Sequence, residues 1–221
     1  MNLPKLSTGD ILGKLKDQRR ITSKPDEREI IAILADTSGS MGGYESMNPP
    51  TTKLQRLQDV LLLFHRGTQA DLLLISFSDE IKLYVQGFVD AVMCLRETGG
   101  TSFVPPLIAA FDTQANRIIL FTDGQASESD YEILHVIKDL TMRKTPKPID
   151  TIGFGPDVNK DLLIAISELT GGIYQHARDY ESLKSSFMRL ETKTYYLEHK
   201  RQFLVTYFQV YSLHTHSKTW R

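Results

Sequence analysis

The chain reads IIAILADTSGSMGG from Ile30 to Gly43. Its apolar part, residues 30–35, predicts a buried strand of a sheet, and this run stops abruptly at Asp36. Asp36, Ser38 and Ser40 alternate, so in an extended segment their side chains point the same way, just beyond the carboxyl end of the strand. Open α/β sheets bind their ligands at that edge. The sequence therefore predicts a ligand site that begins at Asp36.

The chemistry of these three side chains favours a hard metal ion. One carboxylate and two hydroxyls suit Mg²⁺ or Mn²⁺, whereas Zn²⁺ would favour Cys or His. Three ligands do not fill an octahedron, so further oxygen donors have to come from other loops. Thr101 follows the glycine pair in the turn at residues 98–102, and Asp123 ends a second apolar strand. Both are predicted to lie at the same edge of the sheet.

Strand and helix patterns alternate along residues 28–192. Apolar strands are predicted over residues 71–78, 116–122, 149–155 and 173–177, with residues 81–86 as an antiparallel partner of the first. Helices are predicted over residues 53–66, 90–97, 105–111 and 160–169. A further helix is predicted to follow a capping box at 127–130, and a closing helix is predicted over 180–197. This alternation predicts an α/β fold: a doubly wound, Rossmann-like, mostly parallel sheet with one antiparallel edge strand and helices on both faces.

Two details go with this fold. Residues 42–52 hold two glycines, two prolines and two threonines, and we expect no regular element there. The single cysteine, Cys94, falls in the helix predicted over 90–97, and we expect it to be a small core residue and not a reactive thiol.

The domain organisation follows from the same patterns. We expect an N-terminal arm over residues 1–27 with a short helix at 8–20, a domain over residues 28–192, and a C-terminal extension over 193–221. The extension contains an aromatic and β-branched run at 203–211 that predicts a strand. Composition fits one substantial core, since 41% of the 221 residues are hydrophobic and 24% are charged.

The sequence contains no signal for secretion or for a membrane span, and its charge is unevenly distributed. One cysteine excludes an internal disulfide, the first residues lack a secretory pattern, and no apolar run approaches the roughly 20 residues of a membrane span. We therefore expect a soluble, cytoplasmic protein. The two ends are basic, because residues 1–28 carry seven Lys or Arg against four Asp or Glu, and residues 193–221 carry five against one. Solvated termini lying on an acidic body explain this more simply than nucleic-acid or membrane binding.

Three motifs, DTSGS at 36–40, GGT at 99–101 and TDG at 122–124, together resemble a known family. Their types and order are similar to the metal-ion-dependent adhesion site (MIDAS) of the von Willebrand factor A (VWA) domain, over roughly residues 28–190. The resemblance implies that Ser38 and Ser40 bind Mg²⁺ directly, that Thr101 does so directly or through water, and that Asp36 and Asp123 act largely through water and hydrogen bonds. One departure is the length of residues 42–52, since in the family a helix begins soon after the first motif.

The resemblance also implies a function. Neutral hydroxyls and waters leave a bound Mg²⁺ electron-poor, so an Asp or Glu side chain of a partner protein is its expected ligand. We expect a non-catalytic, Mg²⁺-dependent interaction module that acts as an adaptor. Intracellular relatives suggest partners such as AAA+ ATPases or stress-response and kinase/phosphatase systems, whereas nucleic acid is not an expected partner.

Other readings stay open at this point. Ser38, Ser40 and Thr101 could each be ordinary turn residues that bond to their own backbone. A metal-dependent phosphohydrolase could use the same ion to polarise a phosphate, and a nucleic-acid-associated scaffold could use the basic termini. Enzyme motifs are otherwise missing from the sequence: there is no phosphate-binding G-x-x-x-x-G-K-[ST] loop, and none of the six histidines lies in the loops that form the site. We therefore expect no catalysis.

Overall fold

A computed structural model describes residues 29–84 and 86–190, and within them a six-stranded sheet forms the centre. Its spatial order is β5-β4-β1-β6-β7-β8, and β5 alone runs antiparallel, at the edge beside β4. The strands are β1 (Ile30–Asp36), β4 (Asp71–Phe77), β5 (Ile81–Tyr84), β6 (Arg117–Thr122), β7 (Ile149–Phe154) and β8 (Tyr174–Ala177). The predicted mostly parallel sheet with one antiparallel edge strand is confirmed.

The central strand β1 is buried on both faces, as its unbroken apolar run predicts. Ile31 and Ile33 belong to the hydrophobic core on one face of the sheet, and Ala32 and Leu34 belong to the core on the other. This alternation follows from the period of two along a strand. Because β1 pairs with β4 on one side and β6 on the other, its carboxyl end lies in the middle of the sheet edge.

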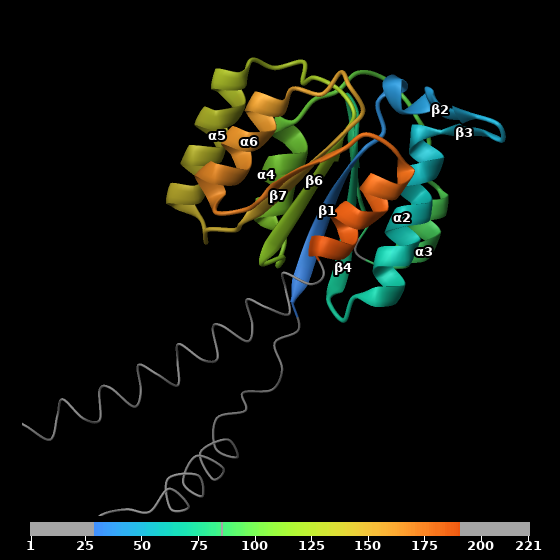
Figure 1. The fold of residues 1–221 in the computed structure, drawn as a ribbon. Coiled ribbons are helices and arrows are strands. Elements are labelled where there is room, and N and C mark those ends of the chain that lie inside the picture. The colour runs from blue at the N-terminus through green and yellow to red at the C-terminus, as the bar shows by residue number, and fades with distance from the viewer. Residues whose placement is uncertain (1–28, 85, 191–221) are drawn as a thin grey trace, which may run out of the picture.

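Helices cover both faces of the sheet, as predicted (Figure 1). One face carries α2 (Lys53–Gly67), α3 (Phe88–Met93) and a last helix that spans residues 180–190 of the described chain. The other face carries α4 (Val104–Asp112), α5 (Asp130–Arg143) and α6 (Lys160–Thr170). Aromatic contacts tie the last helix to α2, with the rings of Phe64 and Phe187 5.6 Å apart in an edge-to-face arrangement.

Two local predictions were wrong. Cys94 is exposed, because α3 buries Phe88, Ala91 and Val92 at helical spacing and the cysteine falls outside that stripe, just after the helix. The cap of α5 is Ser129 and not the first serine of the predicted capping box, since the side chain of Ser129 accepts from the backbone N–H of Glu132.

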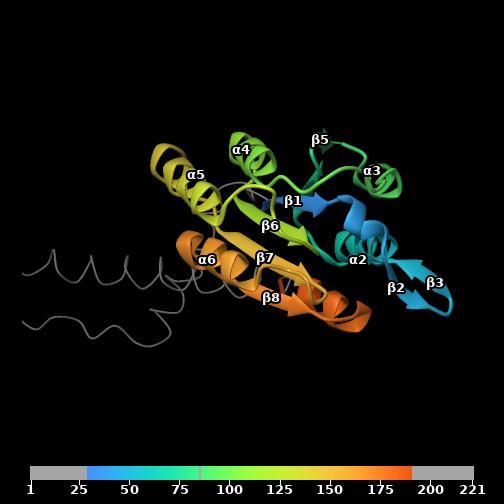
Figure 2. The same ribbon diagram turned by 90° about the horizontal axis from the view of Figure 1, so that it is seen from above.

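The prediction that residues 42–52 form no regular element was also wrong. They contain β2 (Tyr44–Met47) and β3 (Pro50–Thr52), which pair as an antiparallel hairpin that projects beyond α2 (Figure 2). The hairpin leads straight into α2, where Thr52 and Gln55 form a capping box. Pro50 is tolerated because it is the first residue of its strand.

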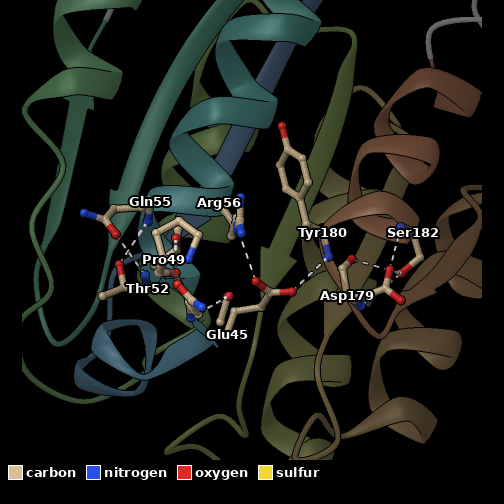
Figure 3. A network of polar contacts seen from close by, with 11 residues as sticks. Glu45, Pro49, Thr52, Gln55, Arg56, Asp179, Tyr180 and Ser182 are labelled. Atoms are coloured by element: carbon tan, nitrogen blue, oxygen red, sulfur yellow. Dashed lines mark hydrogen bonds and ion pairs between the residues drawn. The ribbon is translucent and has the colours of Figure 1, made fainter.

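Contacts outside the hairpin explain why it forms, since two strands alone are barely stable in water. The Glu45 carboxylate accepts from Nε of Arg56 on α2 at 3.1 Å and from the backbone N–H of Tyr180 at 3.3 Å (Figure 3). The Arg56 guanidinium also lies over the Tyr180 ring, 4.6 Å from its centroid. We call Glu45, Arg56 and Tyr180 the hairpin clamp, because they join the hairpin to α2 and to the last helix.

Several predictions lie outside the described residues. They are the arm at 1–27 with its helix at 8–20, the closing helix beyond residue 190, and the extension at 193–221 with its strand at 203–211. The proposed domain boundaries therefore stay predictions. In the part of the chain that the structure describes, no helix is both long and apolar enough to cross a membrane.

Candidate metal centre

The candidate centre lies where β1 and β6 end side by side. The two strands are parallel and paired, with Ala35 opposite Phe121, so Asp36 and Thr122 are the last residues of neighbouring strands. Asp123 follows directly. Apolar side chains fill the middle of both strands, and polar residues follow at their carboxyl ends. The fold thus brings together two carboxylates that lie far apart in the sequence.

A continuous chain of hydrogen bonds links four of the five predicted ligands. The backbone N–H of Ser38 donates to Oδ1 of Asp36 at 2.8 Å, and the hydroxyl oxygens of Ser38 and Ser40 are 3.0 Å apart. The Ser40 hydroxyl in turn donates to Oδ1 of Asp123 at 2.7 Å. Ser40 belongs to the short 3-10 helix η1 (Gly39–Gly42), which turns the chain back over the strand ends. These four residues meet as predicted, but the expected extended conformation was wrong for Ser40, which reaches the site from η1.

The spacing of these oxygens fits a magnesium shell. Mg²⁺ holds its oxygen ligands at 2.0–2.1 Å in an octahedron, so neighbouring ligand oxygens are about 2.9 Å apart. The separation of the Ser38 and Ser40 hydroxyl oxygens, 3.0 Å, is close to this value. All of the donors are oxygens. Two of them are serine hydroxyls, and among the described residues no three His, Cys, Asp or Glu side chains gather in a group that could hold a metal.

Thr101, the fifth predicted ligand, lies in a loop that is fixed against the same site. The backbone N–H of Gly39 donates to the carbonyl of Gly99 at 3.0 Å, and the N–H of Thr98 donates to the carbonyl of Thr37 at 2.7 Å. Thr101 itself is buried. In the described part of the chain no hydrogen bond joins its side chain to the other four ligands, so its place in the metal shell stays a prediction.

Burial sets the electrostatics of Asp36. The residue is fully buried, and this desolvation raises the pKa of its carboxyl above the ordinary value of 3.8, with the nearby Asp123 carboxylate acting in the same direction. Hydrogen bonds from Ser38 and Thr122 oppose the shift. Ser40, by contrast, is exposed, so the centre is open to solvent on the side of η1. A cation placed there would favour the ionised form of Asp36.

Sequence reasoning missed one charged residue of the site. Lys53, the first residue of α2, places its ammonium group 2.5 Å from Oδ2 of Asp123. The two residues are 70 positions apart, and the lysine follows a segment that was not expected to be regular. The one available signal was a lysine in the first turn of a helix, where a positive charge opposes the helix dipole.

The chain was also compared with known proteins. No family model matches it. A von Willebrand factor A domain-containing protein of Dictyostelium discoideum is 24% identical over 183 residues, which cover 75% of this chain and 21% of the relative. The chain thus spans about a fifth of the length of the curated relatives that it matches.

Solved structures of von Willebrand factor A domains also resemble this chain. A von Willebrand factor type A protein from Catenulispora acidiphila superposes with a TM-score of 0.63 at 22% identity, covering 74% of this chain and 42% of the other. The VWA domain of SpRpn10 superposes with a TM-score of 0.56 at 16% identity, covering 73% of this chain and 94% of the other. At this level of identity the likeness concerns the fold alone. Residues 29–84 and 86–190 therefore have the Rossmann-like fold of the von Willebrand factor A domain.

Proposed function

We propose that the chain is a non-catalytic, Mg²⁺-dependent protein-interaction module that binds an acidic side chain of a partner protein through the metal ion. The observation that carries this proposal is the oxygen chain from Asp36 through Ser38 and Ser40 to Asp123 at the carboxyl ends of β1 and β6. Named relatives and solved structures with the VWA fold agree with an interaction role, because that fold is typical of protein-binding modules.

Each residue has a distinct part in this proposal. The hydroxyls of Ser38 and Ser40, with Thr101 or a water beside it, would bind the ion directly. Asp36 and Asp123 would hold and polarise its waters and balance its charge. When bound, Mg²⁺ supplies an electron-poor site with exchangeable waters, which a carboxylate oxygen can enter. The exposed hydroxyl of Ser40 leaves that side open to a partner.

We propose a binding role for the carboxylates of the site and not hydrolysis as the main activity. A general acid or base has to stand within hydrogen-bond reach of the reacting group. In the described chain the acids of the site are committed to other groups: Asp36 accepts from Ser38 and Thr122, and Asp123 accepts from Ser40 and Lys53. We therefore assign the carboxylates to holding the ion.

The test is a pull-down with the full chain, with Mg²⁺ and with chelator, comparing wild type with Asp36→Asn. Asp59→Asn serves as a matched control, because Asp59 is an exposed acid on α2. We expect proteins that are retained only by wild type and Asp59→Asn, and only with Mg²⁺. Isothermal titration with Mg²⁺ alone should show binding to these two proteins and none to Asp36→Asn.

A second measurement separates binding from hydrolysis. Generic phosphoesters are offered to wild type with Mg²⁺ or Mn²⁺. Turnover that Asp36→Asn abolishes and Asp59→Asn keeps would replace the interaction module with a metal-dependent phosphohydrolase. Retention of the same proteins in chelator would contradict the metal-dependent part of the proposal.

A further inference from the structure

Lys53 is an unusual residue for its position. It opens α2, where the helix dipole disfavours a positive charge, and the first turn of α2 contains no acidic residue to offset it. Its ammonium group instead reaches Asp123, whose side chain is fully shielded from solvent, while that of Lys53 is 19% exposed. A pair shielded to this degree interacts more strongly than a surface ion pair. The position of Lys53 is therefore explained by its ion pair with Asp123 and not by a contribution to the stability of α2.

Backbone from two other segments lies close to the Lys53 side chain. The N–H of Lys53 donates to the carbonyl of Gly43 at 2.9 Å, which closes the base of the hairpin. A Cβ atom on Gly43 would lie 3.9 Å from Cε of Lys53, and one on Gly155 would lie 4.0 Å from its Nζ. The lysine side chain therefore passes close to two glycines, one at the end of β7 and one at the hairpin, on its way to Asp123.

The two oxygens of Asp123 have different partners. Oδ1 accepts from the Ser40 hydroxyl, which belongs to the proposed metal shell, and Oδ2 accepts from Lys53. An ammonium group on one oxygen withdraws negative charge from the other, and it repels a divalent cation bound nearby. Lys53 and a metal ion thus compete for the negative charge of the same carboxylate, that of Asp123.

We propose that Lys53 is a built-in counter-ion of the metal site, which neutralises Asp123 in the metal-free protein and lowers the affinity of the site for Mg²⁺. This inference rests on the proposed function. With a bound cation favouring the ionised form of Asp36, two carboxylates and one ammonium group leave one negative charge, and the divalent ion turns this into one positive charge. The carboxylate of a partner restores neutrality. Lys53 therefore couples tight metal binding to the arrival of an acidic ligand.

The experiment is isothermal titration of Mg²⁺ alone into the full chain. Lys53→Met removes the charge and keeps an unbranched side chain, and Lys53→Gln is a second variant in case the first folds poorly. Lys160→Met is the matched control, because Lys160 is the first residue of α6 and is exposed. We expect both variants of Lys53 to bind Mg²⁺ at least tenfold more tightly than wild type, and Lys160→Met to stay within twofold of it.

Thermal unfolding gives a readout that does not depend on a partner. In chelator, Lys53→Met should melt below wild type, because Asp36 and Asp123 then repel each other without a counter-ion. Saturating Mg²⁺ should raise its melting temperature by more than it raises that of wild type. Equal or weaker Mg²⁺ affinity in both variants of Lys53 would overturn the inference and leave the proposed function standing. Failure of wild type and all variants to bind Mg²⁺ would overturn both.

Discussion

The hydroxyl of Thr122 donates a 2.6 Å hydrogen bond to Oδ2 of Asp36, and so joins the ends of β6 and β1 across 86 positions of the sequence. Both side chains are fully buried. The other carboxylate oxygen accepts from the backbone N–H of Ser38, which fixes the start of the loop that carries the two serines. The carboxylate assigned to the metal therefore also holds the two strand ends together.

This double role predicts different results for two substitutions of Asp36. Asparagine can keep the acceptor for Ser38 and offer its amide to Thr122, whereas alanine leaves both groups without their buried partner. In chelator we expect Asp36→Asn to be at least as stable as wild type, and Asp36→Ala to lose about 1–3 kcal/mol of unfolding free energy. Both should lose Mg²⁺ binding. Urea unfolding and Mg²⁺ titration measure these effects, and an alanine variant as stable as the asparagine variant would show that the two bonds contribute little.

The raised pKa of Asp36 predicts a pH dependence of the metal-free protein. Burial holds the proton on this carboxyl more tightly in the folded than in the unfolded state, whose ordinary pKa is 3.8. The folded state is therefore favoured below that value and loses stability as pH rises through the raised pKa. The free energy of unfolding of wild type minus that of Asp36→Asn, in chelator, should fall over this range. A difference that stays flat from pH 3 to 8 would contradict the shift.

Much of this centre could be predicted from the sequence, because local rules decide it. Apolar runs that end in an acid place Asp36 and Asp123 at strand ends, and a parallel sheet brings neighbouring strand ends together. The alternation of small polar residues also predicts Ser38 and Ser40 beside them, although Ser40 reaches the site from the 3-10 helix η1 and not from an extended chain. None of these steps depends on a contact between distant side chains.

The hairpin and the lysine could not be predicted, because distant contacts decide both. Glu45 accepts a hydrogen bond from the backbone N–H of Tyr180, which is 135 positions away, and no local sequence pattern predicts such a partner. Without the clamp, the prolines and glycines of residues 42–52 indicate only a break in regular structure. The position of Lys53 depends in turn on the hairpin that precedes it.

A buried lysine on the other side of the molecule predicts a loss of stability. Nζ of Lys147 donates to the carbonyls of Ala110, Phe111 and Thr113 at 2.8–3.1 Å, and so satisfies the carboxyl end of α4. Lys147→Met should lower the unfolding free energy by about 2–3 kcal/mol, since buried carbonyls lose a charged donor. Lys138→Met, at an exposed position of α5, is the control and should change it by less than about 0.5 kcal/mol. Urea unfolding compares the two.

The hairpin that follows η1 at the candidate metal centre presents large side chains to solvent. Tyr44 is 62% exposed and Met47 is 75% exposed, while Glu45 between them is part of the hairpin clamp. Deleting the hairpin would remove the clamp together with these two side chains, and would confuse a loss of binding with a loss of structure. Point substitutions at Tyr44 and Met47 avoid this problem.

The double substitution Tyr44→Ser and Met47→Ser should therefore weaken partner binding without changing the metal site. Exposed aromatic and Met side chains next to a binding centre supply much of the energy of an interface, so we expect retention of the Mg²⁺-dependent partners to fall about tenfold or more. Mg²⁺ affinity and urea stability should match wild type, because both side chains are largely exposed and neither is one of the proposed metal ligands. Tyr131→Ser with Met142→Ser is the matched control: these residues are 78% and 69% exposed on α5, across the sheet from the hairpin. Equal retention by the two double variants would reduce the hairpin to a connector between η1 and α2.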